Sequence, residues 1–303
     1  MATHLHLDPF SGIAGDMFLG ALLDLGVELS AVEAGLEKLG IEDPYHLHAH
    51  RVSKCGIGGV DLKVHTQPHS HTHHHDHTHD HGHKHEHDHG HRHGHDHDHG
   101  HHHGDHHHHH PHVGYREIMA MVAKLDVSEP NRQRAERVVT RLAEAEARVH
   151  GTTLEQIHFH EVGAVDSIVD MLGSVIALDA LGVDTLSCGP LPLSRGFVKC
   201  DHGLMPVPAP ATAYLMEGLP TFGVDRRGEL VTPTGAALVV GVCEAFGPPP
   251  AMTLRGVGYG AGDRDDPDVP NLLRVMLGET TSAGDLGPMT SVEPTQTAEP
   301  VAS

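Results

Sequence analysis

Tryptophan is absent from the 303-residue sequence, and aromatic residues make up only 3% of it. Two stretches account for part of this shortage, because a histidine-rich run and a polar C-terminal tail offer almost nothing to a core. Without apolar side chains to bury, neither stretch can offset the entropy lost on ordering, so both are expected to be disordered. We therefore predict a globular region over 1–278, with a disordered histidine-rich loop inserted at 67–112 and a disordered tail at 279–303.

Cysteines and basic residues are also scarce. The four cysteines are widely spaced and form no CxxC pair, which argues against a disulfide framework and against a thiolate zinc site. Only 20 lysines and arginines accompany 41 aspartates and glutamates, so the formal net charge is −21. Nucleic acid is therefore not an expected partner, because phosphate binding needs clustered basic side chains, whereas an acidic chain suits cations.

Long apolar runs are missing too. No stretch approaches the roughly 18 uninterrupted apolar residues that a membrane-spanning helix requires, so no membrane partner is expected. The opening residues, MATHLHLDPFSG, have neither the basic region nor the long apolar region of a secretory signal. These absences, together with cysteines that need no oxidation, predict a cytoplasmic protein.

The residues that are present predict alternating helices and strands. Apolar residues at helical spacing predict helices at 17–25, 30–39, 117–125, 129–150, 164–181, 209–217 and 234–246. Short alternating segments predict strands at 4–7, 46–54, 60–65, 183–187, 196–199, 221–224, 253–259 and 271–277. This order predicts an α/β fold, or a mixed α+β fold, in which a mixed sheet is flanked by helices.

Histidine is the residue in excess, since 26 of the 36 histidines lie between residues 69 and 112. Imidazole is a good ligand for Ni²⁺, Zn²⁺ and Cu²⁺, and the interspersed aspartates attract divalent cations. Runs such as HDHGHRHGHDHDHGHHH offer many interchangeable ligand pairs, which predicts loose binding of several ions. The expected ligands alternate along the run: His73, His75, His77, His79, His81, His83, His85, His87, His89, His91, His93, His95, His97, His99, His101 and His103. A purification tag or neutral low-complexity sequence is the alternative, but the internal position and the interleaved Asp and Gly argue against a tag.

A second group of metal-ligating residues lies in a segment that should fold. His158 and His160 share one face if the segment is extended, and Asp166 and Asp170 share a helix face at i and i+4. Glu161 lies between the two pairs. Carboxylates on an apolar helix are costly to bury unless they are paired or metal-bound, so the cluster predicts a metal site or a base beside one. In the structural alternative, Asp166 caps a helix turn and the histidines form hydrogen bonds at a polar boundary; the spacing favours neither.

The segment DPFSGIAGDM joins a predicted strand to a predicted helix. Its small residues, Ser11, Gly12 and Gly15, could cradle a phosphate on backbone N–H groups at the helix N-terminus. No lysine follows the glycines, so this is not a Walker A loop, and Asp8 and Asp16 would favour a cation over bare phosphate. The pattern alone favours the alternative, a tight turn in which Asp16 is an acid in the first helical turn.

Two glycine- and proline-rich stretches give weaker signals. The stretch CDHGLMPVPAPATAYLMEG places His202 where it could ligate a metal, although a single histidine is more often part of a structural hydrogen bond. The stretch ELVTPTGAALV places Thr232 and Thr234 at a helix N-terminus that could bind phosphate.

Five blocks of this sequence together resemble the LarC family, the nickel insertion proteins of nickel-pincer cofactor biosynthesis. The blocks are DPFSGIAGDMFLGALLDLG, HFHEVGAVDSIVD, HGLMPVPAPAT, ELVTPTGAA and GYGAGDRDDPDVPNLLRV. The similarity runs from about Leu5 to Gly278 and is interrupted only by the histidine-rich loop.

The resemblance implies a nickel insertase, a cyclometallase of the lyase class. Such proteins insert Ni²⁺ into pyridinium-3,5-bisthiocarboxylic acid mononucleotide and consume CTP. The substrate supplies two sulfurs and one ring carbon to the metal, so the protein needs no CxxC pair. Forming the nickel–carbon bond requires the loss of a ring proton, which calls for a base. The candidates are the carboxylates Asp16, Glu161, Asp166 and Asp170 and the imidazoles of His158 and His160.

Full-length LarC proteins continue into a further C-terminal domain that is associated with CTP binding and oligomer formation. This chain ends in its tail instead, so we expect it either to work with a separately made C-terminal partner domain or to be a shortened product. The expected ligands and partners are Ni²⁺, CTP with Mg²⁺ or Mn²⁺, the mononucleotide and nickel-pincer-dependent enzymes. The alternative function is non-catalytic storage or delivery of nickel or zinc through the histidine-rich loop.

Overall fold

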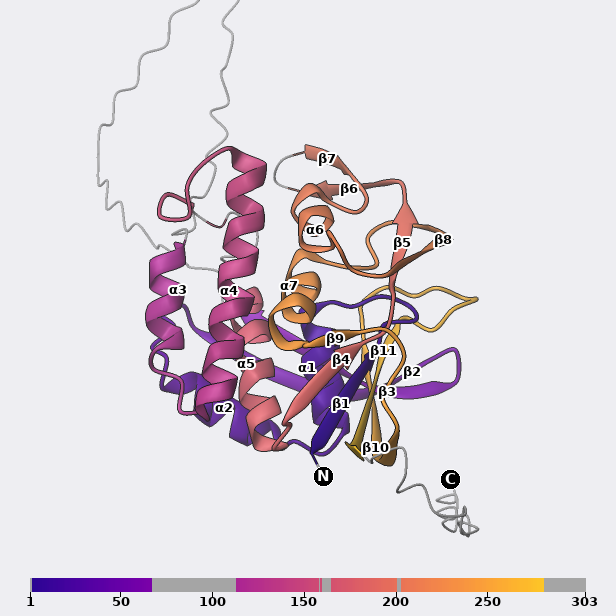
Figure 1. Ribbon diagram of the computed structural model, residues 1–303. Helices are drawn as coiled ribbons and strands as arrows, with labels where there is room; N and C mark the ends of the chain where they lie inside the picture. The colour runs from indigo at the N-terminus through magenta and orange to yellow at the C-terminus, as the bar shows by residue number, and fades with distance from the viewer. Residues whose placement is uncertain (1, 67–112, 158, 160–164, 201–202, 281–303) are drawn as a thin grey trace, which may run out of the picture. The chain divides into compact units, whose positions relative to one another are not determined.

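Figure 1 shows the computed structural model of the chain. The described residues are 2–66, 113–157, 159, 165–200 and 203–280. The predicted boundaries of the histidine-rich loop and of the tail fall almost entirely outside these residues and stay predictions.

Seven helices and eleven strands form within the described residues. The helices are α1 (Gly15–Asp24), α2 (Leu29–Glu37), α3 (Tyr115–Val122), α4 (Glu129–His150), α5 (Val165–Ala180), α6 (Pro210–Leu215) and α7 (Pro233–Val242). The strands are β1 (Thr3–Asp8), β2 (Tyr45–Lys54), β3 (Ile57–Thr66), β4 (Thr185–Cys188), β5 (Leu191–Arg195), β6 (Phe197–Cys200), β7 (Gly203–Pro206), β8 (Thr221–Arg227), β9 (Ala245–Phe246), β10 (Met252–Ala261) and β11 (Leu272–Thr280).

The main sheet has seven strands in the order β2-β3-β10-β11-β1-β4-β9. Strand β1 is antiparallel to β11, with Leu7 opposite Val275, and parallel to β4, with Leu7 opposite Cys188. Strand β10 is antiparallel to β11 and parallel to β3, and β2 pairs with β3 as an antiparallel hairpin. Parallel and antiparallel pairs thus occur in one sheet, which confirms the predicted α/β fold with a mixed sheet.

Helix α1 lies unusually close to the sheet because β10 presents glycines beneath it. A side chain at Gly260 would collide with the backbone of Met17, and one at Gly258 would collide with the carbonyl of Ala21. Since these glycines have no Cβ, the helix and the strand pack backbone against backbone. This contact holds the first turns of α1 against the sheet, shortly after the chain leaves β1.

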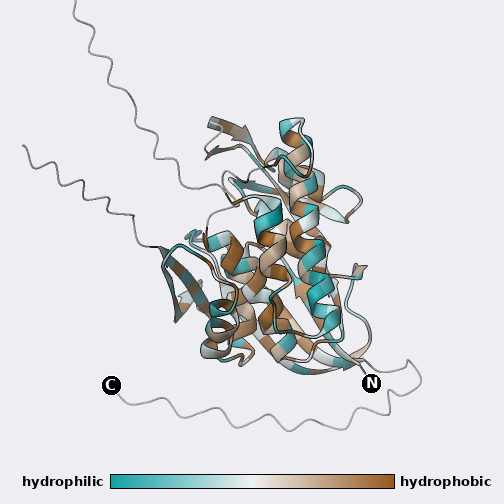
Figure 2. Cartoon of the chain, turned by 90° about the vertical axis from the view of Figure 1, so that its left-hand side faces the viewer, coloured by the Kyte–Doolittle hydropathy of each residue, from teal (hydrophilic) through white to brown (hydrophobic). Residues whose placement is uncertain are grey.

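The other large helices supply the aliphatic core. Helix α4 buries Val138, Val139 and Leu142 on one face, while its remaining residues are largely polar (Figure 2). Helix α5 is buried along most of its length, from Val165 to Leu178. None of the helices in the described part of the chain is long and apolar enough to cross a membrane.

Helix α7 ends earlier than the sequence pattern predicts. The helix expected over 234–246 stops at Val242, and Cys243 is already extended, with φ −85° and ψ 137°. The helix ends here because the next residues bond to strand β4 instead. Glu244 N–H donates to the carbonyl of Leu186 (3.0 Å), and the Glu244 carboxylate accepts from Leu186 N–H (2.7 Å). The two residues that follow form β9 beside β4.

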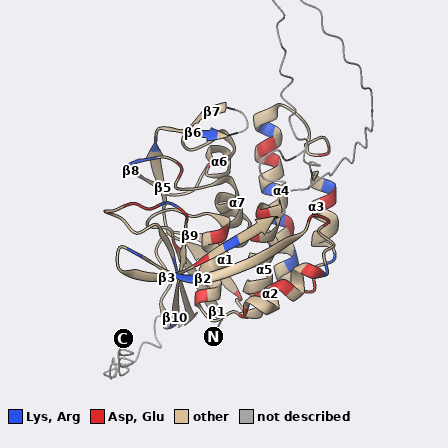
Figure 3. Ribbon diagram, turned by 180° about the vertical axis from the view of Figure 1, so that it is seen from behind, with Lys and Arg blue, Asp and Glu red and all other residues tan. Residues whose placement is uncertain are grey.

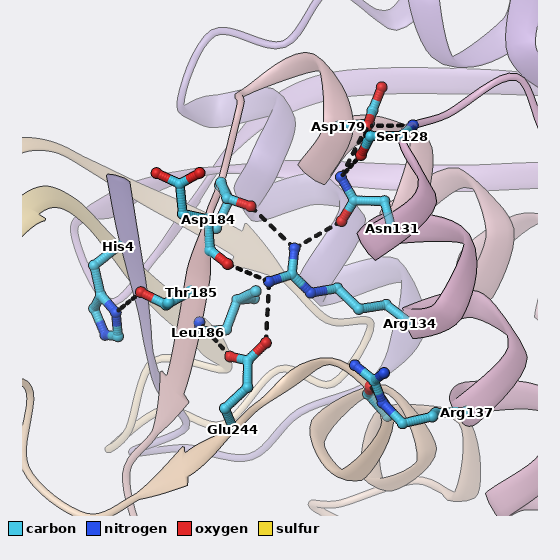
Figure 4. Close-up of polar contacts among 12 residues, drawn as sticks. His4, Ser128, Asn131, Arg134, Arg137, Asp179, Asp184, Thr185, Leu186 and Glu244 are labelled. Atoms are coloured by element: carbon cyan, nitrogen blue, oxygen red, sulfur yellow. Dashed lines mark hydrogen bonds and ion pairs between the residues drawn. The ribbon is translucent and has the colours of Figure 1, made fainter. Parts of the chain in front are cut away.

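A buried arginine joins α4 to this sheet edge (Figure 4). The Arg134 side chain is only 3% exposed. Its Nη1 donates to Asn131 Oδ1 (2.7 Å) and to the Val183 carbonyl (3.0 Å), and its Nη2 donates to the Asp184 carbonyl (2.6 Å) and to Glu244 Oε1 (3.0 Å). One guanidinium therefore satisfies acceptors from α4, the turn before β4 and the residue before β9.

Candidate functional site

The loop between β1 and α1 is held against the start of α7. Ile13 N–H donates to the Leu230 carbonyl (2.9 Å), and Thr232 N–H donates to the Ile13 carbonyl (3.1 Å). Gly12 has φ +121°, and a side chain there would collide with the Leu230 carbonyl. Only glycine fits at this position, so the glycine in the sequence has a structural reason independent of any ligand.

The predicted phosphate-binding residues therefore lie together in one region. The Thr232 hydroxyl caps α7 by accepting the Gly235 N–H (3.1 Å), and Thr234 is buried in the first turn. The Gly12 N–H is already bonded, donating to the Pro9 carbonyl (3.1 Å). A phosphate-binding role for Ser11, Gly12, Gly15, Thr232 and Thr234 stays a prediction.

Two carboxylates from distant parts of the sequence meet at the start of α1. Asp170, in the second turn of α5, reaches the backbone of α1 at Gly15. A Cβ added at Gly15 would lie 2.6 Å from both the Cβ and Oδ2 of Asp170, so the missing side chain makes this approach possible. The neighbouring Asp16 lies in the first turn of α1, and its Oδ1 accepts the Met17 N–H (2.7 Å).

Burial changes the acidity of both carboxyl groups. It raises the pKa of Asp16 to about 6. Burial first, and then the negative charge of Asp16, raise the pKa of Asp170 well above its ordinary value. Asp170 Oδ1 is buried and has no hydrogen-bond partner among the described residues. Burial thus favours the protonated form of both groups, and Asp16, with a pKa of about 6, can take up a proton near neutral pH.

We expect Asp16→Asn to stabilise the protein at neutral pH. A raised pKa means that the folded state binds this proton more tightly than the unfolded chain does, so the free energy of unfolding falls as the pH rises from about 4 to about 6. Asparagine has no charge to bury, and the free energy of unfolding at pH 7 should rise by roughly 1–3 kcal/mol. Urea unfolding at pH 7 measures this gain, which should shrink towards zero near pH 4. If Asp16→Asn and the wild type have equal free energies of unfolding at pH 7, burial does not destabilise the Asp16 carboxylate.

Other charged groups surround the pair. Asp166 is exposed in the first turn of α5, its Oδ1 accepts the Ser167 N–H (2.7 Å), and its charge contributes to the raised pKa of Asp170. On β3, Asp61 and Lys63 form an ion pair (2.9 Å). Lys63 lowers and Asp61 raises the pKa of Asp16, which places both within electrostatic reach of it.

Asp8, a predicted metal ligand, lies at the end of β1. It accepts a hydrogen bond from Arg274 Nε (2.9 Å) on β11 and forms an ion pair with the same guanidinium. This arginine competes with any cation for the carboxylate. Metal binding by Asp8 stays a prediction.

Arg226, on β8, is a polar residue that the sequence patterns did not reveal. Its Nη1 donates to the hydroxyl of Ser11 (2.9 Å), and its Nε donates to Asp266 Oδ2 (3.2 Å). Its Nη2 is buried without a hydrogen-bond partner in the described part of the chain. A buried guanidinium N–H that lacks an acceptor is costly, and a phosphate oxygen would satisfy it.

The remaining candidates lie outside the described residues. They are Glu161, His158, His160, His202 and the alternating histidines from His73 to His103. Within the described residues, no three His, Cys, Asp or Glu side chains are arranged to hold a metal ion. The roles predicted for these residues stay predictions.

Comparison with known proteins places the chain in a family. A family model described as nickel insertion protein matches residues 5–298. A relative from Geobacter metallireducens that is named for nickel insertion is 42% identical over 276 residues, which cover 91% of this chain and 60% of the relative. A similarly named relative from Citrifermentans bemidjiense is 44% identical over 278 residues, or 92% of this chain and 62% of the relative.

No solved structure matches this chain. The chain spans about three-fifths of the length of the curated relatives described above. The family model nevertheless covers nearly all of the chain, and the identity to these relatives exceeds 40%. The chain therefore belongs to the nickel insertion protein family.

Proposed function

We propose that this chain inserts Ni²⁺ into pyridinium-3,5-bisthiocarboxylic acid mononucleotide to form the nickel-pincer cofactor. Membership of the nickel insertion family supports the metal and the reaction class. The resemblance of the sequence blocks to LarC supports the substrate. The observation that carries the mechanism is the approach of Asp170 to the start of α1 at Gly15, beside Asp16, whose pKa of about 6 lets it accept a proton near neutral pH.

The proposed step exchanges a carbon–hydrogen bond for a carbon–nickel bond. The two thiocarboxylates of the substrate hold Ni²⁺ next to the ring carbon, the C–H bond breaks, and its electron pair forms the Ni–C bond. The released proton goes to the ionised Asp16, and nickel remains in the +2 state. A carboxylate with a pKa near 6 accepts a proton more readily than an ordinary aspartate does, which is how a general base is matched to neutral pH.

Arg226 is proposed to hold the phosphate of the mononucleotide. It is bonded to Ser11, which lies in the same loop that leads to Asp16, and its buried Nη2 lacks an acceptor. A phosphate bound there would place the nucleotide beside the carboxyl pair. Thr232 and the loop glycines are proposed to line the same region.

We expect Arg226→Gln to weaken binding of the metal-free mononucleotide by roughly 10- to 100-fold, because a hydrogen bond to a charged group contributes about 1.5–3 kcal/mol. Isothermal titration calorimetry measures this loss. Arg195→Gln is the matched control, since Arg195 lies on neighbouring β5 and forms an exposed ion pair with Asp225. An unchanged dissociation constant for Arg226→Gln would remove Arg226 from the binding site.

CTP, with Mg²⁺ or Mn²⁺, is proposed as a co-substrate that acts together with a separate C-terminal partner domain. The support is the LarC resemblance and the length of the relatives, which extend beyond the part that this chain matches. The product would then pass to nickel-pincer-dependent enzymes. The second candidate function is storage or delivery of nickel or zinc, and the 26 histidines between residues 69 and 112 favour it.

Mass spectrometry of the small-molecule product separates these functions. The chain is mixed with the metal-free mononucleotide, nickel(II) chloride and CTP, with and without the C-terminal domain of a relative. Insertion predicts a nickel adduct that has lost protons. If nickel binds to the protein but no adduct forms under either condition, the chain stores or delivers the metal.

A further inference from the structure

Figure 3 shows the β2–β3 hairpin from behind. On one face this hairpin carries histidines that lie outside the histidine-rich segment of the sequence. His46, His48 and His50 alternate along β2, so their side chains project from the same side of the sheet. Opposite them on β3 stand His65, Lys63 and Asp61, in that order. The intervening residues Leu47 and Leu62 face the core instead. All four histidines of the hairpin are exposed.

The four imidazoles lie close enough to share ions in pairs. The ring centroids of His46 and His65 are 4.8 Å apart, those of His48 and His50 are 5.2 Å apart, and those of His48 and His65 are 6.4 Å apart. With a metal–nitrogen bond of about 2 Å, two imidazoles on one ion have centroids roughly 4.5–6.5 Å apart. Each of these pairs thus needs only side-chain rotation to bind one ion.

One end of this histidine face lies beside the candidate active site. His50 Nε2 is 3.6 Å from Asp61 Oδ2. Asp61 in turn raises the pKa of Asp16, so it lies within electrostatic reach of the carboxyl pair. At the other end, β3 finishes at Thr66, and the histidine-rich part of the sequence begins at His69. The histidine face therefore runs from the end of β3 at Thr66 to Asp61.

We propose that His46, His48, His50 and His65 form a nickel-binding face that holds Ni²⁺ in exchangeable two-imidazole sites. No third protein ligand converges on any of these pairs among the described residues, so water would complete the coordination. Two imidazoles and water bind Ni²⁺ more weakly than a closed site does, which suits transfer rather than storage. A role in delivering nickel towards Asp16 and Asp170 rests on the proposed function, whereas nickel binding by the face does not.

Histidine footprinting of the full chain tests the binding. Diethyl pyrocarbonate modifies the same neutral ring nitrogens that bind a metal, and peptide mass spectrometry locates each modification. With nickel(II) chloride at ten times the half-protecting concentration, mass action predicts about tenfold slower modification of the four hairpin histidines. His150, on α4, is the internal control and should keep its rate. Equal rates at the hairpin with and without nickel would overturn the proposal.

A double variant separates coordination from simple coverage by another part of the chain. His48→Gln/His65→Gln removes at least one partner from each of the three pairs, so His46 and His50 should regain their nickel-free reactivity. Continued protection of both histidines in this variant would show that they are covered and not coordinated, which would also overturn the proposal.

Delivery is tested separately by single-turnover insertion with nickel limiting. The variant with all four histidines changed to glutamine should insert nickel several-fold more slowly than the wild type, with equal rates at excess nickel. If this variant inserts nickel at the wild-type rate when nickel is limiting, the delivery role is overturned, whereas the proposed nickel binding is unaffected. Absence of insertion by the wild-type chain would contradict the proposed function and the delivery role, while the footprint would remain a valid test of binding.

Discussion

Replacing Asp16 with asparagine is expected to lower the rate of nickel insertion by about 10²–10⁴-fold, the usual contribution of a general base. The substitution preserves the size of the side chain but removes the group that accepts the ring proton. Asp170 is not expected to take over, because burial raises its pKa well above the ordinary value and so favours its protonated, non-basic form. Single-turnover insertion at saturating nickel, followed by mass spectrometry, measures the loss.

The same variant should be more stable than the wild type, which excludes misfolding as the cause of its inactivity. Asp225→Asn serves as a control, because Asp225 is 82% exposed and pairs with Arg195 on the surface. Its insertion rate should match that of the wild type. Insertion by Asp16→Asn within threefold of the wild-type rate would remove Asp16 from the chemistry.

Arg134→Ala is expected to destabilise the fold by about 2–5 kcal/mol, because each acceptor left without its donor away from water costs about 1–3 kcal/mol. The alanine leaves the carbonyls of Val183 and Asp184 without their donor (Figure 4). Urea unfolding measures the change. Insertion should persist under conditions where the variant is folded, because Arg134 makes its contacts away from the carboxyl pair.

Arg141→Ala is the matched control for this variant. Arg141 is on the same helix and pairs with Glu144, but both side chains are at least half exposed. Exposed pairs of this kind contribute less than about 1 kcal/mol. If Arg134→Ala and Arg141→Ala lower the free energy of unfolding equally, the loss comes from removing any arginine of α4 and not from breaking the buried hydrogen-bond network.

The sequence was most informative where local signals define an element. The predicted helix at 129–150 matches α4 at both ends. Pro130 lies in its first turn, and Gly151 follows its end in the left-handed conformation, with φ +61°. Proline and glycine at these two positions are strong start and stop signals that depend little on tertiary contacts.

Tertiary competition explains the elements that were predicted incorrectly. The apolar pattern continues past Val242, yet α7 stops there because the backbone of Glu244 pairs with β4. Strands β5, β7 and β9, of two to five residues, were not predicted at all. Segments this short show little period, and the equally short β4 and β6 were predicted only with shifted bounds.

The candidate site was predictable only in part. Asp16 and Asp170 were identified as separate features of two motifs, but their contact depends on Gly15, and no sequence spacing indicates it. Arg226 lies in no recognisable motif. The hairpin histidines could have been identified, because the alternation His-Leu-His-Ala-His inside a predicted strand places three imidazoles on one face.

The pH dependence of insertion tests the central claim, that Asp16 beside Asp170 is the base. At saturating nickel, the single-turnover rate of the wild type should rise with pH and level off above about pH 6, as Asp16 ionises. Asp61→Asn removes the nearby negative charge that raises the pKa of Asp16, so this rise should shift to lower pH. If the rise came from histidines elsewhere in the chain losing their protons, Asp61→Asn would leave it in place. A pH–rate profile that is flat near pH 6, or one that Asp61→Asn does not move, would contradict the account.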